Sequence, residues 1–422
     1  MTEESQENFN NLDNFELKNG TSCCTKKVCI IVLSLIILTA VIAGGLIVYF
    51  FILNKKCEIG EEEKCLTCDK KDCASCNPGY KLSNGKCIID YSIKAEYYIE
   101  AVREIKLIYD SFLNQINELI IDGEIIEPCT KYNFNSTGIH KVYFKMDISN
   151  INSLYNPFQS IAYVTFISFS PLFNTENITD MGRMFSGCYK LTSIELSNLN
   201  TQNVTDMVAI FSSLYSIKSI DLSNFNTEKL ETMDAMFYGA NVTFLNLSNF
   251  KVDKIWSMIH AFHDCQSLTS IDFTNFKVPK LLTLQSTFEN CISLKSVDLS
   301  GFNTENFRMF ADTFRNCYSL KSVDLSNFKA NKDIYYSRMF ENCTSLTHVN
   351  FNNFSFQVTA DSMFSECPSI TFIDISSFWT ELSEVSLFGT LPPKGEIIVN
   401  ASFISKLKEG QIPEGWTITL IG

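Results

Sequence analysis

One pattern of hydrophobic and polar positions repeats along residues 152–378, with a period of about 26 residues. In each unit a phenylalanine is followed by apolar residues six, nine and eleven positions later, as Phe288 is by Leu294, Val297 and Leu299. Alternation at the last positions predicts one short strand per unit, and the fixed period predicts that successive units stack. The nine phenylalanines that mark the units are Phe158, Phe185, Phe211, Phe237, Phe262, Phe288, Phe314, Phe340 and Phe364.

A unit of this size cannot bury its own apolar face, so its neighbours must complete the core. The array is therefore predicted to be a parallel β-sheet solenoid of the leucine-rich-repeat type, whose flat sheet is the natural binding face. With strands about 4.8 Å apart, its nine units would form a rod on the order of 40 Å long. The turn that carries a Met-Phe pair, as in Met184-Phe185, is predicted to form the opposite wall as a short helix or an irregular turn.

The units resemble a known family of repeats. Residues 314–328, Phe-Arg-Asn-Cys-Tyr-Ser-Leu-Lys-Ser-Val-Asp-Leu-Ser-Asn-Phe, resemble the BspA-like leucine-rich repeat surface proteins. They are especially similar to the variant first noted in mycoplasma surface proteins and classed as a domain of unknown function. The resemblance implies a parallel-sheet solenoid on a cell surface, used for adhesion or recognition without catalysis. One departure is that the asparagine after each strand, such as Asn198, follows the last core apolar residue by two positions instead of three.

A long apolar stretch lies at residues 28–53, which carry no charge and are flanked by Lys26-Lys27 and Lys55-Lys56. At about 1.5 Å per residue, a helix there would cross a hydrocarbon core of about 30 Å, so the stretch is predicted to be a transmembrane signal anchor. Residues 1–27, which are rich in Asn, Glu and Ser, are predicted to be a disordered cytosolic tail. The lysine pairs leave the orientation open, but the cysteines that follow favour an oxidising exterior. The prediction is a single-pass type II protein of the plasma membrane with an extracellular ectodomain.

Residues 54–88 contain six cysteines in a segment too short to build a hydrophobic core. The even number favours disulfides, and the spacing resembles small EGF-like extracellular modules, which implies three bonds of open connectivity. Two Cys-x-x-Cys pairs keep zinc as the alternative. The segment is predicted to be a stiff collar, and its cysteines are Cys57, Cys65, Cys68, Cys73, Cys76 and Cys87.

The segments on either side of the array are predicted to cap it, because the first and last strands would otherwise expose unpaired edges. Residues 89–151 are predicted to be a β-rich amino-terminal cap, with a hairpin centred on Asp122-Gly123. Residues 98–117 within it fit either a strand or a helix. Residues 379–422 are predicted to be the carboxyl-terminal cap that closes the last unit.

A cysteine recurs three residues after the marker phenylalanine, and stacking would bring successive cysteines about 5 Å apart. Leu214 and Ala240 occupy the same place in two units, so the position requires a small apolar side chain and not a bridge. Buried free thiols are therefore predicted at Cys188, Cys265, Cys291, Cys317, Cys343 and Cys367.

The outward position in the middle of each strand is usually acidic, which predicts a ladder of carboxylates on the exposed sheet face. Like charges on neighbouring strands repel, so adjacent serines and lysines, bound calcium or a basic protein partner must offset them. The predicted binding-face residues are Glu195, Asp221, Asp272, Asp298, Asp324 and Asp374. A second ladder is predicted to bond the turn backbone of adjacent units through Asn198, Asn224, Asn249, Asn275, Asn327 and Asn353.

The formal charge of −13 argues against nucleic acid as a partner. The sequence has no Gly-rich phosphate loop, nucleophile elbow or Ser/His/Asp set, so no enzyme activity and no cofactor other than the calcium alternative are predicted. His260-x-x-His263 resembles a metal site but lies in an ordinary unit. The predicted function is recognition of an extracellular protein or glycan; the alternative is a surface coat or antigen that self-associates as a homo-oligomer. Glycosylation candidates are Asn135, Asn177, Asn203, Asn241, Asn342 and Asn400.

Overall fold

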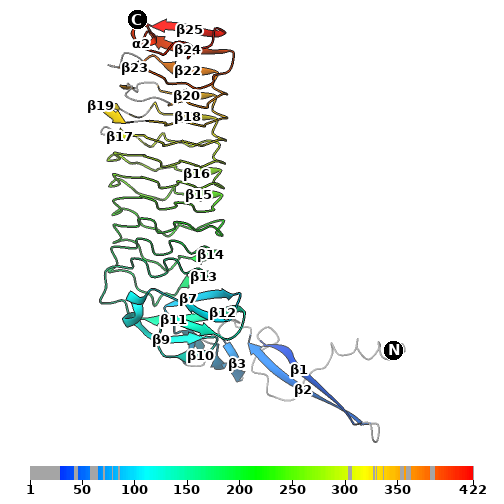
Figure 1. Cartoon of the computed structure of the whole chain (residues 1–422). Coiled ribbons are helices and arrows are strands. Elements are labelled where there is room, and N and C mark those ends of the chain that lie inside the picture. The colour runs from blue at the N-terminus through cyan, green and yellow to red at the C-terminus, as the bar shows by residue number, and fades with distance from the viewer. Residues whose placement is uncertain are drawn as a thin grey trace. The chain divides into compact units, whose positions relative to one another are not determined.

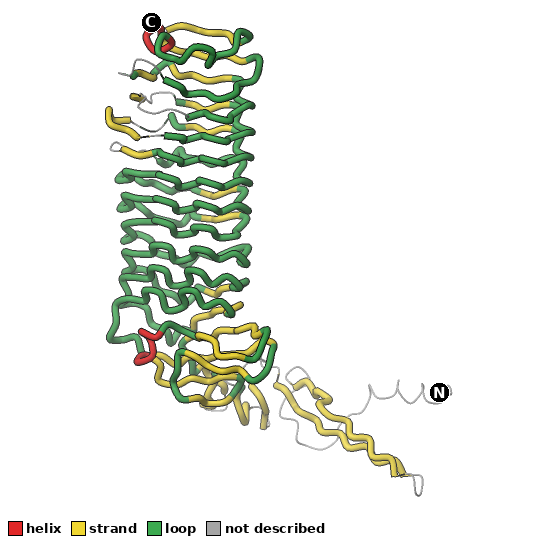
Figure 2. Tube along the Cα trace, viewed as in Figure 1, coloured by secondary structure: helices red, strands yellow, loops and turns green. Residues whose placement is uncertain are grey.

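The chain divides into two compact units, Met1–Tyr91 and Ser92–Gly422, which are described separately. Figure 1 labels their elements, and Figure 2 distinguishes helix, strand and loop along the same trace. The computed structural model describes residues 29–41, 46–57, 65–69, 72–77, 79–83, 86–302, 307–326, 328, 330–335, 337–351, 356–357, 363–380 and 385–421.

The first unit begins with two antiparallel strands, β1 (Cys29–Val41) and β2 (Leu46–Cys57). The helix predicted over residues 28–53 is therefore wrong for the part of that stretch that the structure describes. A continuous apolar run does not distinguish a helix from a strand by its period, and the many Ile and Val residues here favour an extended backbone. Across the described ranges, the structure contains no helix with the length and apolar character needed to cross a membrane. The predicted tail at 1–27 lies outside the described residues.

Two short antiparallel pairs lie within the segment predicted as the cysteine-rich collar. The first places Cys65 opposite Cys76 and Cys68 opposite Cys73. Cys76 is disulfide-bonded, and the complete set of three disulfides, like the zinc alternative, stays a prediction. The strands are β3 (Cys65–Asp69), β4 (Asp72–Cys76), β5 (Tyr80–Ser83) and β6 (Lys86–Ile89), with β5 paired to β6.

The second unit begins with a mixed sheet of order β10-β9-β12-β7-β13-β14, which continues into the solenoid. β7 pairs antiparallel with β12 and β13, whereas β13 pairs parallel with β14, the first short strand of the repeats. The antiparallel strands thus cover the edge that the first solenoid strand would leave unpaired. Their bounds are β7 (Ile93–Ile99), β9 (Ile116–Ile121), β10 (Glu124–Ile126), β12 (Gly138–Met146), β13 (Val164–Phe169) and β14 (Ser193–Glu195).

The hairpin predicted around Asp122-Gly123 is confirmed by the antiparallel pairing of β9 with β10. Both turn residues have a positive φ, 50° at Asp122 and 94° at Gly123, as a primed turn requires. Residues 98–117, which the sequence left open, combine a strand and a 3-10 helix. Those elements are β8 (Arg103–Lys106), which pairs with β11 (Lys131–Phe134), and η2 (Asp110–Gln115).

The repeats form a parallel solenoid, as predicted, with short strands stacked on one side of the turns (Figure 1). Equivalent residues of successive units lie in register, as Val323 does with Val349. These strands are β15 (Phe244–Asn246), β16 (Ser270–Asp272), β18 (Ser322–Asp324), β20 (His348–Asn350) and β22 (Phe372–Ile375). Further parallel pairs are β17 (Phe307–Met309) with β19 (Ala330–Tyr335), and β21 (Phe356–Gln357) with β23 (Phe378–Trp379).

The Met-Phe segment is an irregular turn, which decides between the two predicted alternatives. Residues two positions before and two after the phenylalanine have a left-handed backbone, with φ of 55° at Arg183 and 73° at Gly187 around Phe185. The N–H of Phe185 donates to the carbonyl of Ile210 in the next unit at 3.1 Å, and the N–H groups of Arg183 and Gly187 donate to the next unit in the same way. Because this conformation is easiest for Gly, Asn and Asp, those residue types recur directly before the cysteine position.

The marker phenylalanines form a continuous stack at the centre of the core. Rings of consecutive units lie nearly parallel, with centroids 5.4 Å apart for Phe262 and Phe288 and 5.3 Å apart for Phe288 and Phe314. The nine phenylalanines of the predicted units are fully buried. The stack continues to Phe388, which lies 5.7 Å from Phe364 and so adds a turn within the segment predicted as the carboxyl-terminal cap.

The carboxyl-terminal segment adds two more parallel strands, β24 (Gly395–Asn400) and β25 (Trp416–Ile421), with the short helix α2 (Ala401–Ile404) after β24. Ile418 and Leu420 lie opposite the buried Ile397 and Val399 in the inward rows of the sheet. They are nevertheless 45% and 57% exposed. The inward row of β25 is therefore left uncovered by the residues that the structure describes.

Candidate interaction surface

The predicted binding-face residues occupy one column along the solenoid sheet. Glu195 lies beside Ser168 of the amino-terminal sheet, and Asp272 and Asp324 lie beside Asn246 and Asn350 in the parallel register. Asp272 and Asp374 are partly exposed, and the rest of the predicted set is exposed, namely Glu195, Asp221, Asp298 and Asp324.

Most of these carboxylates bond the backbone of their own turn. Asp298 Oδ1 accepts from the N–H of Ser300 at 2.8 Å, two residues later. Asn246 accepts from Ser248 N at 3.0 Å in the same way, so an amide can replace the carboxylate without loss of the turn. Equivalent bonds are made by Asp221, Asp272, Asp324 and Asp374.

Hydrogen bonds from Ser223, through its side chain and its backbone N–H, hold the pKa of the Asp221 carboxyl below its ordinary value. The pKa of Asp272 is lowered by Thr274 in the same way. The ladder is therefore structural at its five aspartates, because one carboxylate oxygen of each is committed to the turn. Within the residues that the structure describes, no group of three or more His, Cys, Asp or Glu side chains could hold a metal ion.

The rest of the sheet face carries polar side chains and some aromatic rings, of which Phe166 and Phe372 are partly exposed. Lys295 and Lys321 are exposed at the start of their strands, which places positive charge close to the acidic column. Phe244, where most units have serine, is 48% exposed. A shallow pocket of about 180 Å³ lies between Glu195 and Asp221. This face therefore offers carboxylates, ammonium groups and hydroxyls on a flat sheet.

The second predicted ladder, formed by asparagines, is confirmed as structural at Asn198, Asn224 and Asn249, whereas Asn275 is exposed and has a left-handed backbone with φ of 66°. Asn198 Nδ2 donates to the carbonyl of Phe169 at 2.8 Å, and Asn224 Nδ2 donates to those of Ser197 at 2.8 Å and Leu199 at 3.2 Å. Asn249 bonds the preceding unit in the same way, whereas Asn327 and Asn353 lie outside the described residues. These bonds fix the chain direction directly after each strand.

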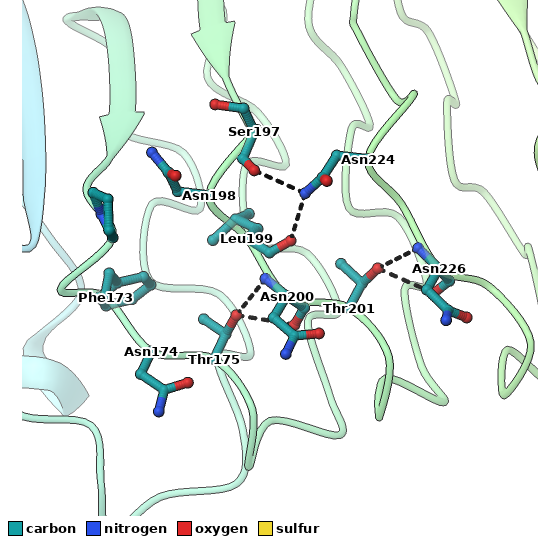
Figure 3. Close-up of a pocket in the computed structure, with 11 residues that line it drawn as sticks. Phe173, Asn174, Thr175, Ser197, Asn198, Leu199, Asn200, Thr201, Asn224 and Asn226 are labelled. Atoms are coloured by element: carbon teal, nitrogen blue, oxygen red, sulfur yellow. Dashed lines mark hydrogen bonds between the residues drawn. The ribbon is translucent and has the colours of Figure 1, made fainter.

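An uncharged pocket of about 420 Å³ lies beside this ladder and was missed in the sequence (Figure 3). Thr175 Oγ1 donates to the carbonyl of Asn200 at 2.9 Å and accepts from its N–H at 2.8 Å. Thr201 repeats both bonds with Asn226 one unit later. The signal was present as an Asn-Thr pair that recurs in three successive units, from Thr175 to Thr227, and again at Asn303-Thr304.

The predicted free thiols are confirmed, because all six cysteines of the repeat position are buried and unbridged. Cys291 Sγ donates to the carbonyl of Phe262 in the preceding unit at 3.1 Å, and the other five make equivalent bonds. Burial disfavours the thiolate and raises the pKa of Cys188, Cys265 and Cys367 to about 12. These cysteines therefore fill the core and are poor nucleophiles.

His263 belongs to a row of charged residues that directly follow the stacked phenylalanines. Its Nε2 lies 3.3 Å from Glu289 Oε2, and Arg315 pairs with both Glu289 at 3.2 Å and Glu341 at 3.1 Å. Glu289 is desolvated, yet hydrogen bonds from His263 and Ser286 and the nearby charges lower its pKa to about 2. His263 thus lies in an ion-pair row, and His260 packs edge-on against it with ring centroids 5.1 Å apart.

The glycosylation candidates differ in their surroundings. Asn135 and Asn177 are exposed. The amide nitrogens of the other four candidates donate to neighbouring groups: Asn203 to Glu176 O, Asn241 to Tyr215 O, Asn342 to Asn316 Oδ1 and Asn400 to Ser376 O.

Short parallel strands in several turns, a central phenylalanine stack and an asparagine ladder together define a leucine-rich-repeat solenoid, a class that suggests a role in protein interaction. The comparisons agree: residues 149–272 match a mycoplasma protein family of unknown function, and residues 260–391 match the BspA type leucine rich repeat region in six copies. The array of this chain therefore belongs to the BspA-type leucine-rich repeats.

No curated protein matches the chain. Among solved structures, the crystal structure of a TLR13–ssRNA13 complex matches at 15% identity, covering 60% of this chain and 50% of that chain, with a TM-score of 0.22. The chain thus matches half the length of that protein. A likeness this low carries no argument about function.

Proposed function

We propose that this chain is a cell-surface binding protein that recognises an extracellular protein through the polar sheet face of its solenoid. The observation that carries the proposal is the outward column from Glu195 to Asp374, in which Asp272 and Asp324 lie beside the equivalent residues of adjacent strands and bonds such as that from Ser300 N to Asp298 Oδ1 fix the backbone. A rigid flat sheet with exposed charged side chains suits recognition of a partner surface. BspA-type repeats support a binding role without catalysis.

The net charge of −13 and the acidic column favour a partner with a basic surface. Charge complementarity of this kind mainly raises the association rate and is screened by salt. The test is binding of the purified full-length chain to an array of extracellular proteins at low and high salt, with and without calcium. Binding that requires calcium would instead favour the cation alternative.

A matched pair of variants locates the binding face. The double variant Asp272→Asn and Asp298→Asn removes two sheet-face charges but keeps both turns, because Asn246 occupies the same column naturally. The control Asp180→Asn and Asp206→Asn changes two carboxylates that also bond their own turns, but on a second line of parallel bridges. The sheet-face variant should slow association while the control binds normally. If the sheet-face variant and the control associated with the partner equally fast, the sheet face would not be the binding face.

We also propose that the protein lies at the plasma membrane with residues 54–422 outside the cell. The support is the cysteine-rich segment at residues 54–88, whose disulfide-bonded Cys76 suits an oxidising exterior. Protease treatment of intact cells should remove an epitope at the carboxyl terminus and leave one at residue 1. The opposite result would reverse the orientation.

A second candidate, a self-associating coat, is favoured by the uncovered inward row of β25. Ile418 and Leu420 are 45% and 57% exposed, although their partners in β24 belong to the core. Sedimentation of the full-length chain should then show association that rises with concentration and falls in Leu420→Lys. If the protein were a monomer at all concentrations, the coat proposal would fail and recognition would be the one proposed function that remains.

A further inference from the structure

A pocket of about 380 Å³ lies where the third, fourth and fifth stacked turns lead from the phenylalanine to the strand. It is lined by Tyr215 and Tyr238, by the backbone at Gly239, and by Asn241, Asp264 and Gln266. We call it the tyrosine pocket. It lies apart from the carboxylates of the sheet-face column, none of which lines it.

The pocket is present because a row of exposed tyrosine rings ends at Tyr215. The position four residues after the stacked phenylalanine is Tyr189, then Tyr215, and then Asn241. The two tyrosine rings stack at 5.4 Å with an interplanar angle of 8°, and they are 44% and 53% exposed. Since the following unit has no ring at this place, the second face of Tyr215 borders the pocket.

Glycine keeps that space open. Gly239 has a φ of 65°, and a Cβ atom there would lie 3.3 Å from Tyr215 Cε1. Its neighbour Ala240 replaces the cysteine or leucine of other units. The fourth unit, marked by Phe237, is therefore the one with the smallest side chains beneath the exposed ring.

The polar groups of the pocket are held in place by their neighbours. Asn241 Nδ2 donates to Tyr215 O at 2.8 Å, and its Oδ1 accepts from Ser267 Oγ at 2.5 Å. Asp264 Oδ1 accepts from Asn290 Nδ2 at 2.8 Å, and its Oδ2 lies 3.2 Å from His263 Nδ1. The Gln266 side chain is exposed at the mouth. The pocket thus combines one open aromatic face with fixed donors and acceptors.

We propose that the tyrosine pocket binds a neutral saccharide, with a pyranose ring stacked on Tyr215 and its hydroxyls bonded to Gln266 and Asp264. A pyranose presents C–H groups on its face, which the negative face of an aromatic ring attracts. Its hydroxyls both donate and accept, as the amide and carboxylate groups here require.

Other ligand classes fit less well. A cation cage needs several free aromatic faces, but Tyr238 already stacks on His263 at 4.8 Å with an interplanar angle of 4°. Asp264 Oδ1 already accepts from Asn290 Nδ2, which weakens that carboxylate as a counter-ion. A purely apolar ligand would bury the Gln266 amide against groups that cannot bond it.

The test uses the full-length chain made in a host without N-glycosylation, so that Asn241 stays unmodified. Because residues 28–53 are strongly apolar, the protein is kept in a detergent that carries no sugar. The probes are methyl pyranosides of glucose, galactose, mannose and N-acetylglucosamine, followed by saturation-transfer NMR and confirmed on a glycan array. At least one probe should receive saturation on its ring C–H groups.

The variants assign the binding to this pocket. Tyr215→Ala should weaken the affinity roughly ten-fold and Gln266→Ala a few-fold, and both residues are exposed, so the fold is retained. Tyr318→Ala is the matched control, because Tyr318 stands at the same repeat position and is 44% exposed outside the pocket.

The proposal is overturned if no pyranoside binds, or if Tyr215→Ala binds as well as the parent protein. Binding of tetramethylammonium that is lost in Tyr215→Ala, with no saccharide binding, would assign the pocket to cations instead. The inference does not rest on the sheet-face function. The variant Asp272→Asn with Asp298→Asn should bind the saccharide normally, which separates the failure of one proposal from the failure of the other.

Discussion

Replacing one ring at the centre of the phenylalanine stack tests whether the stack holds the solenoid together. Phe288 is fully buried between Phe262 and Phe314, with ring centroids 5.4 and 5.3 Å away. The change Phe288→Ala removes both ring contacts and leaves a cavity in the core. The spacing of the turns is fixed by backbone bonds such as that from Phe288 N to Thr313 O at 2.9 Å, so neighbouring rings cannot close the gap.

Removal of a buried phenylalanine ring lowers the free energy of unfolding by about 3–5 kcal/mol. Because the site cannot collapse, we expect the upper end of that range, about 5 kcal/mol. A solenoid is stabilised mainly by contacts between neighbouring units. The loss should therefore weaken the interfaces of this unit with the units on either side and leave the ends of the array less affected.

Urea unfolding followed by circular dichroism measures the total loss, and hydrogen exchange shows where protection falls. Exchange should rise first in residues 262–314. The control is Phe244→Ala, since Phe244 is 48% exposed and an exposed position usually changes stability by less than about 0.5 kcal/mol. If Phe288→Ala lowered stability no more than Phe244→Ala does, the stack would not be the main source of stability.

Three further predictions follow from the ladders and the surface. The pKa of the Asp272 carboxyl is lower in the folded state than in the unfolded state, so the stability that this carboxylate contributes is complete above the unfolded pKa of about 3.9 and is lost as pH falls through the folded pKa. Asp272→Asn should therefore reduce the acid sensitivity of the urea midpoint between neutral pH and about pH 3. Unchanged acid sensitivity would contradict this prediction. Burial raises the pKa of Cys265 to about 12, so its thiol should not react with iodoacetamide at mildly alkaline pH until urea unfolds the protein. Prompt alkylation of the native protein would show that the site opens. In protein made in a eukaryotic host, glycopeptide mass spectrometry should find glycans at the exposed Asn135 and Asn177 but not at Asn342. Asn342 has a φ of 63°, and its amide nitrogen donates to Asn316 Oδ1 at 2.8 Å. A glycan at Asn342 would show that this turn forms after modification.

The sequence predicted the fold best where one residue type recurs at a fixed offset. The marker phenylalanines could be assigned to the core from their recurrence. The cysteines three residues later could be assigned to it because Leu214 and Ala240 replace the cysteine in two units. The hairpin at Asp122-Gly123 was equally accessible, since two residues of positive φ have a strong local signal. Phe388 was missed because the units around it lose the other repeat positions, although its ring joins the stack.

The conformation of residues 28–53 illustrates the limit of hydrophobicity alone. A continuous apolar run has no polar positions from which to read a period, so length suggested a helix where the described residues form β1 and β2. The acidic column shows a related limit. Its position on the outer face followed from strand alternation, but the bond from each carboxylate to its own turn depends on backbone angles that the pattern does not contain.

The sequence by itself determined the period of the solenoid, its inward residues and the composition of its outer columns, because these depend only on which residues recur. Tertiary structure decided what those columns can do. The tyrosine pocket joins Tyr215 to Gln266, two units apart in the chain, and it exists only because Gly239 and Ala240 lie beneath the ring once the turns are stacked. Such a site depends on distances between neighbouring turns, and these are set by backbone bonds between units.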